Sequence, residues 1–152
     1  MNLRNQIKMT QEEIDSFLKE QTSIQIGTIN KDGSPHLTTL WFQFDGSNII
    51  FHTYTKSQKI KNLKRDNRIS LISEFGTEYR NLKGVMIYGK AEIISGEDMH
   101  EKVTKGIESV SLKYNHISIS KEYLESMKFQ AKKRSVVIVK PKKYISWDHN
   151  KI

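Results

Sequence analysis

The stretch F-H-T-Y-T-K-S-Q-K-I-K-N-L, residues 51–63, indicates both the fold of this chain and a place where it would bind a ligand. Its first half is rich in β-branched and aromatic residues, which favour a strand, and from Ser57 onward apolar residues recur at helical spacing among lysines. A helix that begins there brings free backbone N–H groups, the Ser57 hydroxyl and the ammonium groups of Lys56 and Lys59 together. These donors suit a phosphate, and a serine-capped surface helix with solvated lysines is the alternative.

Similar β-rich runs on both sides of this stretch predict an antiparallel sheet. Asp45-Gly46 between two such runs is a strong hairpin signal, so the first three strands should form a meander. Gly89 should mark a bulge or a close approach of two backbones, and Pro141 should stop or bend the last strand. Six strands are predicted in this way, at residues 23–29, 36–44, 48–55, 68–74, 84–94 and 134–148.

The remaining segments predict short helices outside the sheet. Thr10 and Glu13 have the spacing of a capping box, which starts a helix at residues 11–20. A helix over 97–113 is interrupted by Gly106, and another over 120–132 is capped by Ser120. The last helix should turn four side chains inward: Tyr123, Leu124, Met127 and Phe129. The order of elements favours one mainly β (α+β) domain over residues 1–152, an antiparallel barrel with peripheral helices.

Composition excludes several classes of protein. The 152 residues include no cysteine, so there is no disulfide, thiolate metal site or iron–sulfur cluster. The five histidines form no metal-ligand spacing, and no metal is expected. Neither a signal peptide nor an apolar run long enough to cross a bilayer is present, so we expect a soluble, cytoplasmic protein that does not bind membranes.

The net charge of +8 is concentrated in two segments, 56–68 and 128–143, which is the distribution of one or two anion sites or of a solvated lysine face. A nucleic-acid partner is not expected, because the aromatic residues fall mostly at strand positions that should be buried.

The strand at residues 36–44 carries bulky apolar groups on both faces. Alternation places Leu37, Thr39 and Trp41 on one face and Thr38, Leu40 and Phe42 on the other. We expect the barrel core to cover one face and a helix or a second subunit to cover the other, in preference to direct contact of the aromatic groups with a ligand.

Several motifs together resemble the pyridoxamine 5′-phosphate oxidase-like FMN-binding split-barrel superfamily. They are the D-G-S-P-H hairpin at 32–36, S-Q-K-I-K-N-L at 57–63 followed by N-R-I-S-L, and the final S-W-D. The resemblance implies a six-stranded antiparallel split β-barrel. It also implies a homodimer with two cofactor sites, for FMN or a deazaflavin coenzyme, at the subunit interface. The cofactor contacts that it implies are Leu37, Thr38, Thr39, Leu40, Trp41, His52, Thr53, Lys56, Ser57, Gln58, Lys59, Gly84 and Trp147.

The chain also departs from pyridoxamine phosphate oxidases. Gln58 stands where these enzymes commonly have an arginine, and the chain stops at Ile152 without their longer basic C-terminal segment. The resemblance therefore favours the small, functionally diverse branch, and we expect an FMN-dependent flavoprotein oxidoreductase acting on a small planar substrate.

Two alternatives stay open, and the residues assign no catalytic acid or base. A deazaflavin-dependent reductase on the same fold would use Lys56, Lys61 and Lys64 for the anionic coenzyme tail. A non-enzymatic haem binder would use one of three histidines as axial ligand, namely His36, His52 or His149.

Overall fold

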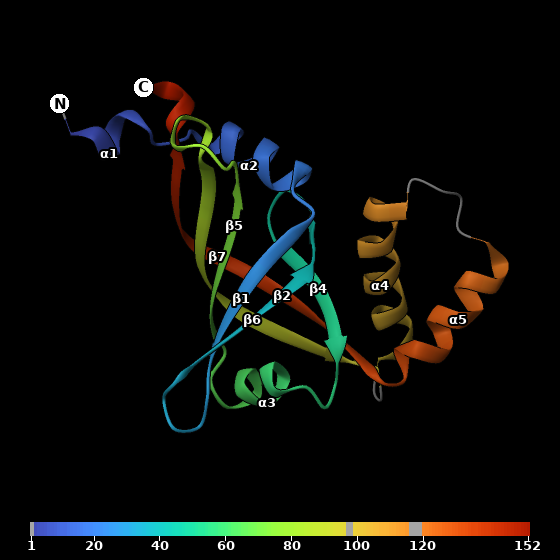
Figure 1. Cartoon of the computed structure of the whole chain (residues 1–152). Coiled ribbons are helices and arrows are strands. Elements are labelled where there is room, and N and C mark those ends of the chain that lie inside the picture. The colour runs from blue at the N-terminus through green and yellow to red at the C-terminus, as the bar shows by residue number, and fades with distance from the viewer. Residues whose placement is uncertain (1, 97–98, 116–119) are drawn as a thin grey trace.

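The computed structural model describes residues 2–96, 99–115 and 120–152, and Figure 1 shows their arrangement. The helices are α1 (Leu3–Gln6), α2 (Gln11–Glu20), α3 (Gln58–Arg65), α4 (His100–Asn115) and α5 (Lys121–Ala131), with 3-10 turns η1 (Tyr79–Asn81) and η2 (His149–Lys151). The strands are β1 (Ser23–Ile29), β2 (Pro35–Trp41), β3 (Gln43–Phe44), β4 (Ile49–Tyr54), β5 (Arg68–Phe75), β6 (Lys83–Ser95) and β7 (Arg134–Asp148). The predicted strands and longer helices are all present.

The strands form one antiparallel sheet in the order β2-β1-β5-β6-β7-β4-β3. The sheet has seven strands, so the predicted number of six is wrong. The extra strand arises because the predicted strand at 36–44 breaks at Phe42, where β2 leaves its ladder with β1 and β3 joins β4. Phe42 is fully buried at this break. The two edges of the sheet are thus joined through the chain itself, which is consistent with the split-barrel class.

The core lies inside the curved sheet and is closed by helices. Ile24, Phe51 and Ile87 are fully buried there, and Phe17 of α2 and Ile60 of α3 belong to the same cluster. The capping box of α2 is confirmed: the Thr10 hydroxyl accepts from the Glu13 N–H at 3.3 Å, and the Glu13 carboxylate accepts from the Thr10 N–H at 2.6 Å. Burying each large apolar side chain stabilises the fold by about 1.5–3 kcal/mol.

Strand β7 continues through Pro141, so the prediction that the strand stops there is wrong, whereas a bulge in β7 next to Pro141 agrees with the predicted bend. The register between β6 and β7 shifts at Tyr88 and Gly89, and Gly89 lies opposite Pro141. This bulge accommodates a residue that has no N–H for the ladder. The prediction for Gly89 is confirmed, because a Cβ there would lie 2.6 Å from the Lys140 carbonyl oxygen.

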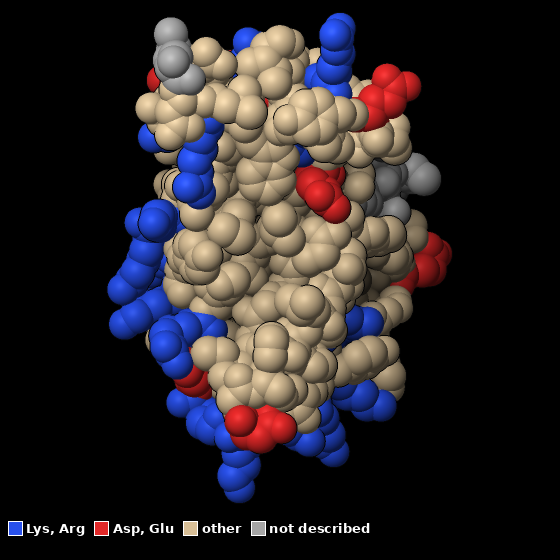
Figure 2. All heavy atoms as spheres, turned by 60° about the vertical axis from the view of Figure 1, so that its left-hand side comes forward, with Lys and Arg blue, Asp and Glu red and all other residues tan. Residues whose placement is uncertain are grey.

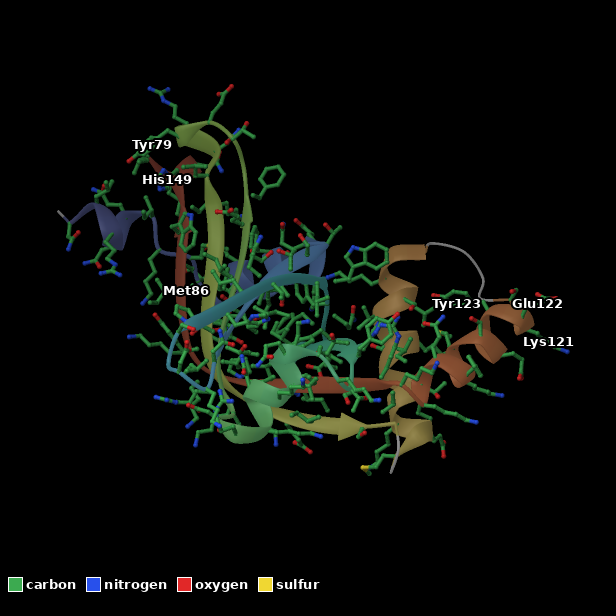
Figure 3. All side chains as sticks on the ribbon, turned by 60° about the horizontal axis from the view of Figure 1, so that its bottom comes forward. Tyr79, Met86, Lys121, Glu122, Tyr123 and His149 are labelled. Atoms are coloured by element: carbon green, nitrogen blue, oxygen red, sulfur yellow. The ribbon has the colours of Figure 1, made fainter. Side chains whose placement is uncertain are left out.

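Helices α4 and α5 form a hairpin beside the part of the sheet formed by β4 and β7 (Figure 1). Helix α4 is continuous through Gly106, so the predicted interruption there is wrong. A Cβ at this position would lie 2.5 Å from Val136 Cγ2, so glycine lets the helix lie close against β7. On α5, Met127 is buried as predicted, whereas Tyr123 and Phe129 are exposed. Tyr123 lies on the part of α5 remote from the sheet (Figure 3). The Leu124 side chain and His116 lie outside the described residues.

One face of the sheet carries a row of uncharged residues across five strands. The register places Thr39, Gln25, Ile72, Met86 and Ile145 side by side on β2, β1, β5, β6 and β7. We call this the outer face, and Figure 3 labels Met86 on it. Figure 2 shows one side of the molecule on which lysines and arginines lie mainly at the border.

The outer face is not covered on β2. Leu37 and Trp41 are 73% and 57% exposed, so the expected covering group is not supplied by the described part of the chain. None of the described helices is long and apolar enough to span a membrane.

Candidate functional site

The start of α3 carries buried polar groups that are poorly satisfied. Ser57 occupies the N-cap position, yet its hydroxyl makes no capping bond and is buried without a partner. Lys59 is only 8% exposed, and its ammonium donates to the Thr53 hydroxyl at 3.3 Å. Burial lowers the pKa of Lys59, because the charged form loses hydration. An anion here would restore a charge-assisted partner to both side chains, so Ser57 and Lys59 fit a phosphate.

A buried asparagine fixes α3 against the sheet. The Asn62 amide donates to the Thr28 hydroxyl at 3.1 Å and to the Asn30 side chain at 3.0 Å. Its oxygen accepts from Gln58 Nε2 at 2.9 Å, so the Gln58 side chain is directed along the helix. Lys56 is exposed in the turn before α3 and was predicted to point to the same site as Lys59.

A second part of the site is a pocket of about 350 Å³ on the other face of β4, lined by Ser23, Thr39, Leu40, Trp41, His52 and Arg134. Side chains alternate along a strand, and the burial of β4 alternates with them. His52 therefore belongs to this pocket, and Thr53 belongs to the buried cluster at Lys59. The two parts of the candidate site thus lie on opposite faces of β4.

Arg134 sets the charge and hydrogen bonding of the pocket. One of its terminal nitrogens lies 3.2 Å from His52 Nδ1, and its guanidinium stacks 4.5 Å from the centroid of the Tyr54 ring. Burial and the Arg134 charge lower the pKa of His52 to about 4. The imidazole is therefore neutral near pH 7, so that Nδ1 accepts from Arg134 and Nε2 carries the hydrogen. The Arg134 Nε is buried without a partner.

No specific role for Arg134 was predicted from the sequence. It appeared only as one cation in the basic segment 128–143, and it lies 82 residues from His52 along the chain. The pairing of β4 with β7 brings them together, with Tyr54 opposite Arg134 and His52 opposite Val136. The only local signal was the position of Arg134 at the start of a predicted strand.

Gly84 and Trp147 lie directly opposite each other on β6 and β7. A Cβ on Gly84 would lie 2.3 Å from Trp147 Cζ2, so the indole packs on the glycine backbone. Trp147 is near the C-terminal end of β7, whereas Arg134 is its first residue, and Gly84 on β6 lies opposite Trp147. At about 3.3 Å per residue, roughly 40 Å of strand separates the two ends. One chain thus brings Thr39, Leu40, Trp41 and His52 to one pocket and Lys59 to Thr53, whereas Leu37 lines another cleft with Gly27 and Tyr88, and Gly84 and Trp147 lie apart.

The described residues contain no group of three or more histidine, aspartate or glutamate side chains that would hold a metal ion. His149 Nδ1 donates its hydrogen to the Tyr79 carbonyl oxygen at 2.8 Å, and the two rings meet edge to face with their centroids 4.6 Å apart. Figure 3 shows this pair at one end of the molecule.

A sequence model described as pyridoxamine 5′-phosphate oxidase matches residues 10–148. The chain belongs to the pyridoxamine 5′-phosphate oxidase family. Among curated proteins, the pyridoxine/pyridoxamine 5′-phosphate oxidase of Photorhabdus laumondii is 33% identical over 79 residues. That match covers 51% of this chain and 35% of the relative, so the matched part spans about a third of the relative's length.

Several solved structures have the same fold as this chain. The conserved hypothetical protein Rv2991 from Mycobacterium tuberculosis is 35% identical with a TM-score of 0.83, over 99% of this chain and 92% of that one. A protein described as an F420 reductase is 19% identical with a TM-score of 0.67, over 86% of this chain and 94% of that one. The second likeness is evidence of fold alone.

Proposed function

We propose that this chain is a flavoprotein oxidoreductase that binds FMN and acts on a small planar substrate. The observation that carries the proposal is the buried Lys59 ammonium beside the Thr53 hydroxyl, together with the unpartnered hydroxyl of Ser57. Lys59 and Ser57 would hold the FMN phosphate. The ring would occupy the pocket lined by Trp41 and His52.

Bound FMN would supply the hydride or electron transfer, and the protein would bind and orient it. His52 is neutral near pH 7 because its pKa is about 4, so its role is to donate a hydrogen bond from Nε2. The unpartnered Nε of Arg134 offers a charged donor in the same pocket. Leu40 and Trp41 would exclude water from the ring.

We also propose that two chains pair through the outer face. Leu37, Trp41 and Tyr88 are 73%, 57% and 42% exposed there, although 28% of the chain is charged and charged residues would normally occupy such positions. A second copy would cover these side chains. It would also bring its own Gly84 and Trp147 toward the pocket, which one chain cannot do.

A deazaflavin coenzyme is the second candidate on the same site. Lys56, Lys61 and Lys64 are exposed around α3, where they would pair with a long anionic tail. A non-enzymatic haem protein is the remaining alternative. Both alternatives predict a purified protein without a tight FMN site.

The test is a fluorescence titration of FMN with the wild type, Lys59→Met and the control Lys61→Met, which removes an exposed lysine of the same helix. A charged hydrogen bond to phosphate contributes about 1.5–3 kcal/mol, so Lys59→Met should weaken FMN binding by about 10- to 100-fold. Lys61→Met should bind FMN as the wild type does. Equal affinity of Lys59→Met and wild type would remove the phosphate assignment.

The wild type distinguishes the three cofactors. Much tighter binding of the deazaflavin than of FMN would favour the deazaflavin reductase. A Soret band in the purified protein, without FMN binding, would favour the haem binder. After FMN binding is shown, reduction of the bound flavin and its reoxidation by candidate substrates test the oxidoreductase assignment.

The pairing of chains is tested separately by light scattering. Leu37→Glu introduces a charge on the outer face, whereas the control Phe129→Glu does so at a 66% exposed residue of α5. We expect the wild type and Phe129→Glu to be dimers and Leu37→Glu to be a monomer with weakened FMN binding. A monomeric wild type, or a dimeric Leu37→Glu, would refute this interface.

A further inference from the structure

A second cleft lies between α4 and the elements α2 and β3, and it shares no lining residue with the pocket at His52. Its volume is about 600 Å³, which is within the range of small-molecule sites. Its lining residues are Lys19 of α2, Gln43 and Phe44 of β3, and Lys105, Glu108, Ser109, Leu112 and Lys113 of α4.

One face of helix α4 packs against the rest of the protein, and the adjoining face lines this cleft. Val103, Ile107 and Val110 are at most 3% exposed. Val103 and Ile107 form an apolar cluster with Met127 of α5 and Val136 of β7. The residues that line the cleft recur at spacings of three and four and therefore form the adjoining face of the helix. This face lines a cleft instead of packing against a neighbouring element.

Lys113 holds its ammonium at the wall of the cleft. The ammonium lies 4.2 Å from the centroid of the fully buried Phe42 ring and donates to the Leu18 carbonyl oxygen at 3.3 Å. That carbonyl belongs to the last turn of α2, whose negative dipole end favours a cation. The ring and the carbonyl thus fix the position of a positive charge.

The cleft combines this charge with apolar surface. Three lysines and one glutamate line it, a net charge of +2. Leu112 is 53% exposed, and Phe44 contributes an aromatic wall. A ligand that matches both features has one negative group and an apolar body.

We propose that this cleft is a second ligand site, which binds a small organic anion, a carboxylate or sulfonate on an apolar body, with Lys113 as its charged contact. Partial burial lowers the pKa of Lys113 to about 8, so a bound anion would draw a proton onto this amine. The other charged groups at the cleft are Lys19 from α2 and Lys105 and Glu108 from α4. Lys105 pairs with Glu101 at 2.9 Å, and β3 contributes no charge.

The experiment compares two dyes with the same aromatic body on the full chain. 1-Anilinonaphthalene-8-sulfonate carries the anion, and N-phenyl-1-naphthylamine lacks it. Fluorescence titrations are made with wild type, Lys113→Met, Lys113→Arg and the control Lys102→Met, an exposed lysine of α4 that does not line the cleft. Circular dichroism establishes that each variant is folded.

We expect Lys113→Met to bind the sulfonate about tenfold more weakly, which corresponds to about 1.4 kcal/mol, and to bind the neutral dye as before. Lys113→Arg and Lys102→Met should keep the sulfonate affinity. In the wild type that affinity should fall between pH 7 and pH 9, as Lys113 loses its proton, and in Lys113→Met it should not. A loss of less than about threefold, an equal loss for both dyes, or a wild type that binds no sulfonate would overturn the proposal.

Discussion

Replacing Gly84 by alanine tests the contact that joins β6 to Trp147. Gly84 is the second residue of β6 and is not among the glycines with positive φ, so its backbone does not require glycine. The added Cβ would lie 2.3, 2.7 and 2.9 Å from three atoms of the indole, Cζ2, Cε2 and Cη2. Ordinary contacts are about 3.5–4.0 Å, so the ring must move by roughly 1 Å.

The size of the effect follows from two opposing contributions. Overpacking of this kind costs about 1–3 kcal/mol. Alanine in a strand loses less backbone entropy than glycine, which returns about 0.5–1 kcal/mol. We therefore expect Gly84→Ala to lower the free energy of unfolding by about 1–2 kcal/mol. In a Trp147→Ala background the clash is absent, and the same substitution should be neutral or slightly stabilising.

Urea unfolding of the four proteins of this double-mutant cycle measures the coupling between the two positions. Far-ultraviolet circular dichroism follows the transition because two of the four proteins lack Trp147. All samples share one protein concentration, since association would shift apparent stability. An equal loss of stability in both backgrounds would refute the reasoning, because the loss would then not arise from the indole.

Further predictions concern three residues whose environment is defined by the fold. His52, with a pKa of about 4, should stay neutral from pH 8 to pH 5.5 in NMR spectra, and Arg134→Met should raise that pKa; a wild-type midpoint near 6.5 would contradict the assigned environment. As the pH is lowered from 6.5 to about 4, the unfolded chain binds a proton at this histidine and the folded chain does not. The stability measured by thermal unfolding should therefore fall as the pH is lowered over that range. Gly106→Ala should destabilise the protein to urea by about 1–2 kcal/mol, since the new Cβ would lie 2.5 Å from Val136 Cγ2, and a gain in stability would show that α4 does not lie against β7. Asn62→Ala leaves a buried hydroxyl on β1 without its donor and should lower the free energy of unfolding by about 2 kcal/mol; an unchanged urea midpoint would show that this amide does not hold α3.

The elements that the sequence predicted well are those fixed by local signals. The strand at 23–29 and the helix at 11–20 agree with β1 and α2 to the residue. Thr10 defines the start of α2 through a bond three residues away, and alternation defines β1 over its own length. Both signals depend only on neighbours in the chain, so no knowledge of tertiary structure was needed.

The errors arise where distant segments decide the local structure. Phe42 breaks a β-rich run because its two halves pair with different strands, and Pro141 stays within β7 because β7 has a bulge beside it, where Lys142 has no partner on β6. Tyr123 and Phe129 were wrongly predicted to point inward, since only packing against α4 and β7 decides which side of α5 is buried. The pairing of His52 with Arg134 required the register of two strands far apart in sequence.

The buried polar atoms that lack partners are distributed in a way that supports the proposed site. In the described residues there are four, namely Gln25 Oε1, Thr38 Oγ1, Ser57 Oγ and Arg134 Nε. These atoms come from four different segments of the chain. Ser57 and Arg134 belong to the two parts of the candidate site. Thr38 is next to Thr39 on β2, and Gln25 lies opposite Thr39 on β1. Each unsatisfied group costs about 1–3 kcal/mol, a penalty that folded proteins rarely retain without a compensating partner. A ligand at Ser57 and Arg134 and a second chain on the outer face at Gln25 would remove most of this penalty, so cofactor binding and pairing of chains should each stabilise the fold.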